Sequence, residues 1–285
     1  MNYNHTVFKA LQWAFLILDQ TTHDRSDAEY LMEHWQKWNH TQLLLHYRDE
    51  LSEQQWQTFQ NMIQRVVNDE PPQYIIGTAP FNDYEFKVTP AVLIPRLETE
   101  ELCQWALVNI KQHHYQKILD IGTGSGILAI TLKKKIPTLK VTATDISQAA
   151  LQVAQENAQT LHADVTFKQG DLFTPIGDEK FDLIISNPPY IAYNEIAVMD
   201  RSVYQNEPHV ALFAEHQGLA IYERLAAQLP THLTPQGQAL FEFGYHQQPA
   251  LQQLFTQAWP QARLTFRKDI AGHMRMLQVQ APKEA

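Results

Sequence analysis

Asn187, Pro188, Pro189 and Tyr190 form the segment of this sequence whose residue types point most directly to chemistry. Two successive prolines fix two φ angles and remove two N–H donors, so the carbonyl oxygens here are exposed without competing donors. The Asn187 side chain adds an acceptor if its oxygen faces inward, and the Tyr190 ring offers a flat surface for stacking. The Asn187 oxygen and the Pro188 carbonyl can therefore hold the two hydrogens of a planar –NH2 group.

Holding an –NH2 group in this way would direct its nitrogen lone pair at an electrophile. An amide nitrogen is a poor nucleophile because its lone pair is delocalised, and accepting its hydrogens raises the electron density as positive charge develops. Positioning would supply most of the catalysis. If the electrophile is a sulfonium methyl group, it is reactive enough that the attack of the nitrogen needs no strong general base. A rigid turn without function is the alternative interpretation of the same four residues.

A glycine-rich loop follows the apolar strand that contains Asp120, and it consists of Gly122, Thr123, Gly124, Ser125 and Gly126. Glycines permit a tight turn and a close approach of the backbone to a ligand. The next strand ends at Asp145, whose carboxylate can accept both ribose hydroxyls of an adenosyl group. Alone, the loop also fits a structural turn or an NAD site. Its spacing, with Asp120 ahead of it, resembles motif I of Rossmann-like methyltransferases, which implies S-adenosylmethionine as the cofactor.

Asp171 and Leu172 follow the third strand of this series. In methyltransferases of this class, an acid at this place often bonds the adenine amino group and an apolar neighbour covers the ring. This resemblance makes Asp171 and Leu172 candidates for the adenine site. A turn capped by Asp171 is the alternative.

Strands alternate with helices from Lys117 onward, which is typical of a mostly parallel sheet with right-handed crossovers. We therefore expect an α/β fold with a seven-stranded sheet over residues 97–285, and the resemblance to motif I implies that this is a Rossmann-like class I methyltransferase domain. The expected strands are Lys117–Ile121, Lys140–Thr144, Asp164–Phe167, Phe181–Ser186, Gln238–Phe243, Arg263–Arg267 and Met274–Gln280.

The first part of the chain has a different pattern. Apolar residues recur at helical spacing, Ser26 is a candidate helix cap, and Ser52 with Gln55 predicts a capping box. The sequence Asp69-Glu70-Pro71-Pro72 then breaks the pattern. We expect a small helical domain over residues 1–72 and a linker with a β-hairpin over residues 73–96.

Composition limits the class of protein. Hydrophobic residues make up 44% of the 285 residues, which is enough for a substantial core. The net charge is −9 and the sequence has no basic stripe, which counts against binding of nucleic acid. Cys103 is the only cysteine, which excludes an intramolecular disulfide and fits a reducing cytoplasm. The thirteen histidines show no spacing typical of a metal site. The first ten residues lack the regions of a signal peptide. A cytoplasmic monomer without metal, membrane or direct nucleic-acid binding is the expectation.

Several separated segments together resemble the bacterial release factor glutamine methyltransferases, over nearly the whole chain. Leu97 departs from the family, which usually has proline there, and Leu172 stands where some relatives carry an aromatic residue. The matching segments, besides the loop, Asp145 and Asn187–Tyr190, are Pro72–Gly77, Val92–Glu100, Glu207–Leu212 and Gly218-Leu219.

The resemblance implies methyl transfer from S-adenosylmethionine to the side-chain N5 of the glutamine in the Gly-Gly-Gln loop of class 1 peptide-chain release factors. By position, residues 122–126 would cradle the cofactor, Asp145 would hold its ribose, and Asp171 with Leu172 its adenine. Asn187 would meet both the methyl donor and the substrate, while Pro188, Pro189 and Tyr190 would complete the glutamine pocket. The helical domain would help to hold the release factor.

Some assignments stay open from the sequence alone. Arg96 and Glu98 shape the cofactor entrance or form an ion pair at a helix start. A nucleic-acid adenine-N6 methyltransferase would use the same Asn-Pro-Pro-Tyr segment, because an exocyclic amine has the same geometry. A ribosomal-protein glutamine methyltransferase and a non-catalytic module with a nucleotide fold are further alternatives.

Overall fold

The computed structural model describes residues 5–282, which form two compact units. The helical unit runs to Thr78 and also includes Asp200–Asn206. The α/β unit comprises the segment Ala79–Met199 and the chain from Glu207 onward. Residues 200–206 were expected within the methyltransferase domain, whereas they pack with the first helices.

Five helices precede the α/β unit, and side chains before four of them cap their first turns. Thr6, Asp24 and Ser52 each accept a backbone N–H at a helix start. The Ser52–Gln55 capping box is present as predicted, but Asp24 caps the second helix in place of Ser26. These helices enclose a separate apolar core. Their bounds are α1 Val7–Leu18, α2 Arg25–Gln36, α3 His40–Leu45, α4 Glu53–Val67 and α5 Pro72–Ile76.

The short helix α9 (Arg201–Asn206) completes the helical unit. Asn206 Nδ2 donates to the main-chain oxygen of Asp69 at 2.7 Å, and the Arg201 guanidinium lies 3.6 Å from the Asp69 carboxylate. Asp69 has a positive φ of 66°, which turns the chain after α4 and presents that oxygen. The helical unit is therefore built from two segments of the sequence.

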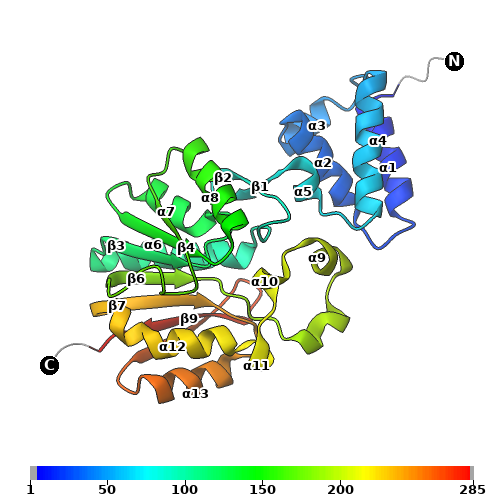
Figure 1. Cartoon of the computed structure of the whole chain (residues 1–285). Helices are drawn as coiled ribbons and strands as arrows, with labels where there is room; N and C mark the ends of the chain where they lie inside the picture. The colour runs from blue at the N-terminus through cyan, green and yellow to red at the C-terminus, as the bar shows by residue number, and fades with distance from the viewer. Residues whose placement is uncertain (1–4, 283–285) are drawn as a thin grey trace. The chain divides into compact units, whose positions relative to one another are not determined.

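A seven-stranded sheet forms the centre of the α/β unit, as predicted, with the order β5-β4-β3-β6-β7-β9-β8 (Figure 1). The pairs among β3 to β7 are parallel, whereas β9 runs antiparallel to both β7 and β8. The strands are β3 Lys117–Ile121, β4 Lys140–Asp145, β5 Thr166–Gln169, β6 Phe181–Ser186, β7 Leu233–Glu242, β8 Arg263–Lys268 and β9 Met274–Gln280.

The strand β7 begins five residues before the predicted Gln238. Leu233 pairs with Phe181, and the register then shifts before Gln238 pairs with Leu183. The extra residues form a bulge that contains Gln236 at a φ of 66°. Because of this irregularity, the start of the strand cannot be predicted from the alternation of apolar and polar residues.

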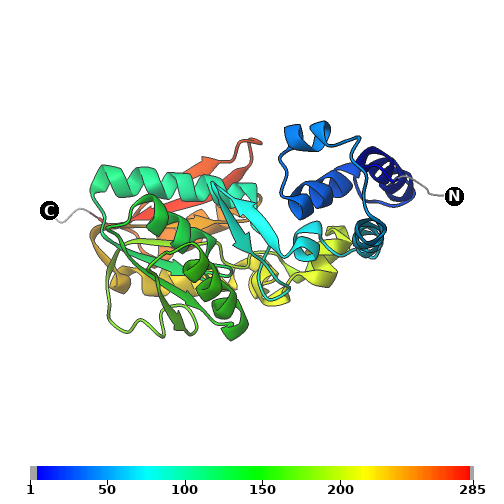
Figure 2. The same cartoon turned by 90° about the horizontal axis from the view of Figure 1, so that it is seen from above.

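Helices cover both faces of the sheet. The helices α6 (Leu97–His113), α7 (Ile127–Lys135) and α8 (Gln148–Thr160) share one apolar core with the sheet, and Figure 2 shows α6 running along that side. The helices α12 (Ala220–His232) and α13 (Gln248–Ala258) lie side by side against the other core (Figure 1). Strands buried on both faces explain the continuous apolar runs of the sequence.

Shorter elements fill the connections of the α/β unit. Asn82 and Asp83 join two strands of a small sheet, which corresponds to the expected hairpin. Among residues 5–282, no helix has both the length and the apolar character that a membrane crossing requires. The remaining elements are β1 Thr78–Phe81, β2 Tyr84–Lys87, η1 Tyr193–Val198, α10 His209–Leu212 and α11 Glu215–Gly218.

Candidate active site

A pocket lies in the α/β unit at the carboxyl ends of the central strands, between β3 and β6. The chain leaves β3 towards β4 on one side and reaches β6 on the other, so this is the point where the strand order reverses. Ligands of open α/β sheets bind at such points. Ten of the twelve candidate residues line it, the exceptions being Gly126 and Tyr190: Gly122, Thr123, Gly124, Ser125, Asp145, Asp171, Leu172, Asn187, Pro188 and Pro189.

The glycine-rich loop forms one wall of this pocket. Gly122 and Gly124 have φ angles of +69° and +56°, which favour glycine. A Cβ atom built on either residue would meet no other atom within 4 Å, so it would stand in free space. Gly126 differs, because a Cβ there would lie 2.7 Å from Ile130 Cδ1. The absence of side chains at Gly122 and Gly124 leaves space in the pocket for a ligand. The absence of one at Gly126 leaves room for Ile130 of α7 and Ala154 of α8.

The buried carboxyl of Asp120 supports the loop from behind. Its Oδ2 accepts hydrogen bonds from Thr123 Oγ1 at 2.6 Å and from the Ala129 main-chain N–H at 3.1 Å. Its Oδ1 is buried and has no hydrogen-bond partner among residues 5–282. Burial raises the pKa of Asp120 to about 7, although the two hydrogen bonds lower it. This residue therefore positions the loop and does not line the pocket.

Asp145 ends β4 and joins the loop to the next helix. Its carboxylate accepts the Gly124 N–H at 2.9 Å and the Ser147 N–H at 2.8 Å. A carboxylate has about four acceptor sites, so acceptor capacity remains for hydroxyl groups of a ligand. Burial raises the pKa of Asp145, and hydrogen bonds from the backbone oppose that change. Asp145 is thus a rigid acceptor at the floor of the pocket.

Asp171 and Leu172 both line the pocket, but Asp171 is partly exposed and ion-paired whereas Leu172 is buried. The Asp171 carboxylate pairs with Arg224 of α12 at 2.5 Å and is 41% exposed. Leu172 is buried and has a φ of +50°, and its main-chain oxygen lies 3.5 Å from Thr144 Oγ1. The Arg224 guanidinium occupies part of the Asp171 carboxylate, which leaves its other acceptor sites for a ligand.

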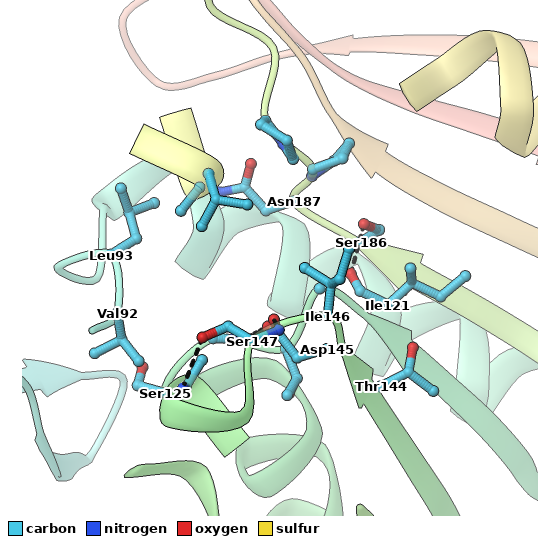
Figure 3. Close-up of a pocket in the computed structure, with 18 of the residues that line it drawn as sticks. Val92, Leu93, Ile121, Ser125, Thr144, Asp145, Ile146, Ser147, Ser186 and Asn187 are labelled. Carbon is cyan, nitrogen blue, oxygen red and sulfur yellow. Dashed lines mark hydrogen bonds between the residues drawn. The ribbon is translucent and has the colours of Figure 1, made fainter. Parts of the chain in front are cut away.

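Asn187 directly follows β6 and faces the pocket from the side opposite Asp145 (Figure 3). Its Nδ2 donates to Thr99 Oγ1 at 3.0 Å, and Thr99 Oγ1 donates to Glu242 Oε2 at 2.7 Å. Within residues 5–282, no hydrogen bond engages Asn187 Oδ1. The acceptor that the sequence analysis required is therefore available, and the donor end of the same amide is fixed.

Tyr190 lies behind the pocket wall, where it holds the end of the Asn-Pro-Pro-Tyr segment. Its hydroxyl donates to Glu242 Oε1 at 3.3 Å, and its main-chain oxygen accepts from Gln247 Nε2 at 2.9 Å. A Cβ atom on Gly218 would come within 2.0 Å of that oxygen, so only glycine fits there. Burial raises the pKa of Tyr190, and the Glu242 charge adds to the rise, so the hydroxyl stays protonated and acts as a donor.

Arg96 pairs with Glu207 and not with Glu98, which corrects the ion pair considered from the sequence. The second oxygen of Glu207 accepts the Ile94 main-chain N–H at 3.2 Å, and the Arg96 guanidinium donates to the first. Glu207 is 3% exposed. It therefore anchors the segment before α6, which lines the pocket through Ile94, Pro95 and Arg96.

Four residues that support the pocket were not predicted from the sequence: Thr99, Glu207, Glu242 and Gln247. Thr99 and Glu207 lie inside segments that were singled out, but nothing in their spacing indicates partners more than a hundred residues away. Glu242 did carry a signal, because it is a single acid in the apolar run of β7. A charged residue inside such a strand is rarely buried unless it is paired.

Comparison with known families divides the chain at similar positions. The PrmC N-terminal domain matches residues 9–77, and the Methyltransferase small domain matches residues 103–212. Among solved structures, a methyltransferase from Pyrococcus furiosus covers 69% of this chain and 88% of its own, with a TM-score of 0.51 and 16% identity. RsmC of T. thermophilus, a 16S rRNA methyltransferase in complex with AdoMet and guanosine, covers 72% and 49%, with a TM-score of 0.53 and 14% identity. These two structures support the fold alone.

Curated relatives are much more similar over nearly their full length. The release factor glutamine methyltransferase of Enterococcus faecalis is 38% identical over 94% of this chain and 97% of its own. That of Lactococcus lactis subsp. lactis is 42% identical over 90% and 94%. With both domain families matched in order as well, the chain belongs to the release factor glutamine methyltransferase family.

Proposed function

We propose that this enzyme transfers a methyl group from S-adenosylmethionine to the side-chain N5 of the glutamine in the Gly-Gly-Gln motif of class 1 release factors. Family membership and the methyltransferase domain support the reaction. The observation that carries it is the Asn187 amide, whose oxygen is the end left unengaged in the pocket while Thr99 holds the nitrogen. An acceptor at that place suits a substrate that offers an –NH2 group.

The pocket fits S-adenosylmethionine on the side of β3 and β4. Gly122 and Gly124 leave open space that a side chain would fill, and Asp145 has acceptor sites for the ribose hydroxyls. Leu172 offers an apolar surface for the adenine, and Asp171 an acceptor for its amino group. Thr123, Ser125 and Gly126 would shape the rest of the cradle. When bound, the cofactor supplies an electrophilic methyl group.

The substrate amide would lie against Asn187 and the Asn-Pro-Pro-Tyr segment. Asn187 Oδ1 and the Pro188 carbonyl would accept its two hydrogens, which concentrates electron density on nitrogen as positive charge develops. Pro189 and Tyr190 would hold the segment in shape. The products are the methylated amide and S-adenosylhomocysteine, and the proton of the amide leaves to solvent. No strong base is required, because the neutral amide attacks.

We further infer that the helical unit contributes to binding of the release factor, since it matches the PrmC N-terminal domain of the family. Because release factors act on ribosomes, we expect the enzyme in the cytoplasm. We expect a monomer that recognises protein and not nucleic acid, in keeping with the net charge of −9.

The test is methylation of purified release factor with labelled S-adenosylmethionine. We expect label in the wild-type release factor, none after the loop glutamine is changed, and mass spectrometry that places the methyl group on the glutamine side chain. Ribosomal protein, DNA and RNA serve as competing substrates. Labelling of an adenine, or of a ribosomal-protein glutamine in preference to the release factor, would contradict the proposal.

A further inference from the structure

The amide of Asn187 has two ends of opposite character, and only one of them suits an –NH2 substrate. An oxygen facing the substrate accepts its hydrogens, whereas a rotated side chain would present its own –NH2 group and repel them. Rotation about the last side-chain torsion exchanges the two ends with little change in shape. Some neighbouring group must therefore determine which end faces the pocket.

Thr99 and Glu242 are placed to make that choice. An ionised carboxylate only accepts hydrogen bonds, and a threonine hydroxyl has a single hydrogen. Once Thr99 Oγ1 donates to Glu242 at 2.7 Å, its oxygen can only accept, so Asn187 must turn its Nδ2 towards it, at 3.0 Å. Thr99 and Glu242 are each 1% exposed, which keeps water from replacing either partner.

We propose that Glu242, acting through Thr99, sets the polarity of the Asn187 amide, so that Oδ1 and not Nδ2 faces the substrate. Both are positioning residues, because neither carries a reacting atom. This inference rests on the proposed function, since only a substrate with an –NH2 group needs an acceptor at Asn187. It adds two residues, from α6 and β7, to the machinery of the Asn-Pro-Pro-Tyr segment.

The same carboxylate also holds the other end of that segment. Glu242 Oε1 accepts from the Tyr190 hydroxyl at 3.3 Å, while its Oε2 accepts from Thr99. The Tyr222 hydroxyl donates to the Glu242 main-chain oxygen at 2.5 Å, which fixes the end of β7. Because one buried carboxylate spans Asn187 and Tyr190, the segment is held at both ends by a single rigid acceptor.

The proton on Glu242 would reverse this arrangement. A protonated carboxyl can donate to Thr99 Oγ1, which frees the hydroxyl to donate to Asn187 Oδ1 and turns Nδ2 towards the substrate. Burial raises the pKa of Glu242 to about 7, and the Glu98 charge adds to the rise. Thr99, Arg275 and Tyr190 lower it, and Tyr222 is the remaining titratable neighbour. The working polarity belongs to the ionised form, so turnover should fall as the pH decreases through about 7.

The test compares Thr99→Val with Thr99→Ser, and uses Thr131→Val as the matched control. Thr131 is also a fully buried helical threonine, but its hydroxyl has no partner among the described residues. With saturating release factor and cofactor, we expect T99V to lower kcat by roughly 100-fold, as for the loss of one oriented polar group in an active site. T99S should restore most of kcat, and T131V should behave as wild type. Cofactor affinity and thermal stability of each variant show that folding is intact.

A second readout does not depend on turnover. In a ¹⁵N-labelled protein, the Asn187 side-chain –NH2 resonances, assigned from their loss in Asn187→Asp, should shift with pH in the wild type as Glu242 titrates. They should not shift in T99V or in Glu242→Gln. The kcat of Glu242→Gln should likewise lack the fall with decreasing pH.

Wild-type kcat in T99V would overturn the proposal, as would Asn187 resonances that titrate identically in T99V and the wild type. If the wild-type protein does not label release factor while the Asn187 resonances still depend on Thr99, the relay stands and the proposed substrate fails.

Discussion

Two buried carboxyls stand on opposite sides of the pocket, and their differences show how the two halves of the site work. Asp120, on the side proposed for the cofactor, and Glu242, on the side proposed for the substrate, each accept a threonine hydroxyl, and burial raises the pKa of both to about 7. Asp120 otherwise holds a main-chain N–H, which can only donate. Glu242 holds the Thr99 hydroxyl, which in turn holds the side-chain amide of Asn187, and an amide can rotate.

A loop held through a backbone N–H therefore keeps the same hydrogen-bond orientation whether or not the carboxyl is protonated. A side-chain amide held through a hydroxyl can present either its oxygen or its –NH2 group to the pocket, and the proton on the carboxyl selects between these two orientations. The cofactor side should thus respond to change by losing affinity, whereas the substrate side should respond by losing turnover.

Asn187→Ala should remove turnover and spare cofactor binding. We expect kcat to fall by roughly 10²- to 10³-fold, because the oriented acceptor acts on charge that develops only in the transition state. The dissociation constant of S-adenosylmethionine, measured by calorimetry, should change by less than about threefold, well under 1 kcal/mol. A large loss of cofactor affinity with little change in kcat would remove the distinction between the two sides.

The two carboxyls should leave a pH signature in stability. Because each pKa is raised in the folded state, the folded protein binds more protons between about pH 4 and about pH 7. The free energy of unfolding should therefore decrease as the pH rises through this window, by on the order of 3 kcal/mol for each group. The full contribution is present below the unfolded-state pKa and is lost above the folded-state pKa.

Asp120→Asn and Glu242→Gln stay neutral at every pH, so each should flatten part of this slope. Urea unfolding of the cofactor-free protein at several pH values measures it. The prediction would be contradicted if the free energy of unfolding of the wild type increased with pH over this window and both variants showed the same slope. Such a result would mean that the pKa values of the two carboxyls are not raised in the folded state.

Asp145→Ala should have the opposite kinetic pattern to Asn187→Ala. Loss of a charged acceptor for the ribose hydroxyls should weaken cofactor binding by roughly 100-fold, or about 3 kcal/mol. At saturating cofactor, kcat should recover to within a few-fold. A kcat that stays low at saturation would mean that Asp145 also orients the methyl donor.

Two glycines provide the smallest and most local comparison. Gly124→Ala should cost about 1 kcal/mol of stability for its positive φ and should hinder the cofactor, because the methyl group enters open space. Gly218→Ala should destabilise by about 1–2 kcal/mol, because its methyl group collides with the Tyr190 main chain. Thermal unfolding with and without cofactor separates the two, since only G124A should lose the stabilisation that the cofactor provides.

The site residues at strand ends could be predicted from the sequence. Asp145 and Asn187 each follow an apolar run, and the carboxyl ends of parallel strands meet at one edge of a sheet, so their types and spacing place them in one site. Most strand bounds follow for the same reason, to within one residue. Two strands differ more: β5 (Thr166–Gln169) begins and ends two residues after the predicted range Asp164–Phe167. The start of β7 was missed because a bulge with a left-handed residue interrupts the alternation.

Thr99 and Glu242 were out of reach for a different reason. They lie 143 positions apart, and their contact depends on the packing of α6 against β7 and on two rotamers. A single buried acid indicates that a partner exists, but only the packed structure identifies that partner. The same holds for α9, whose place in the helical unit depends on one turn at Asp69.

That placement of α9 has a consequence for anyone who wishes to transplant the helical unit between relatives. A cut after Thr78 would leave the donor fragment without α9, and Asp69 would lose both Asn206 and Arg201. The recipient would keep a foreign α9 matched to another surface. A working chimera must therefore exchange two pieces of sequence at once, residues up to 78 and residues 200–206, with three junctions to choose instead of one.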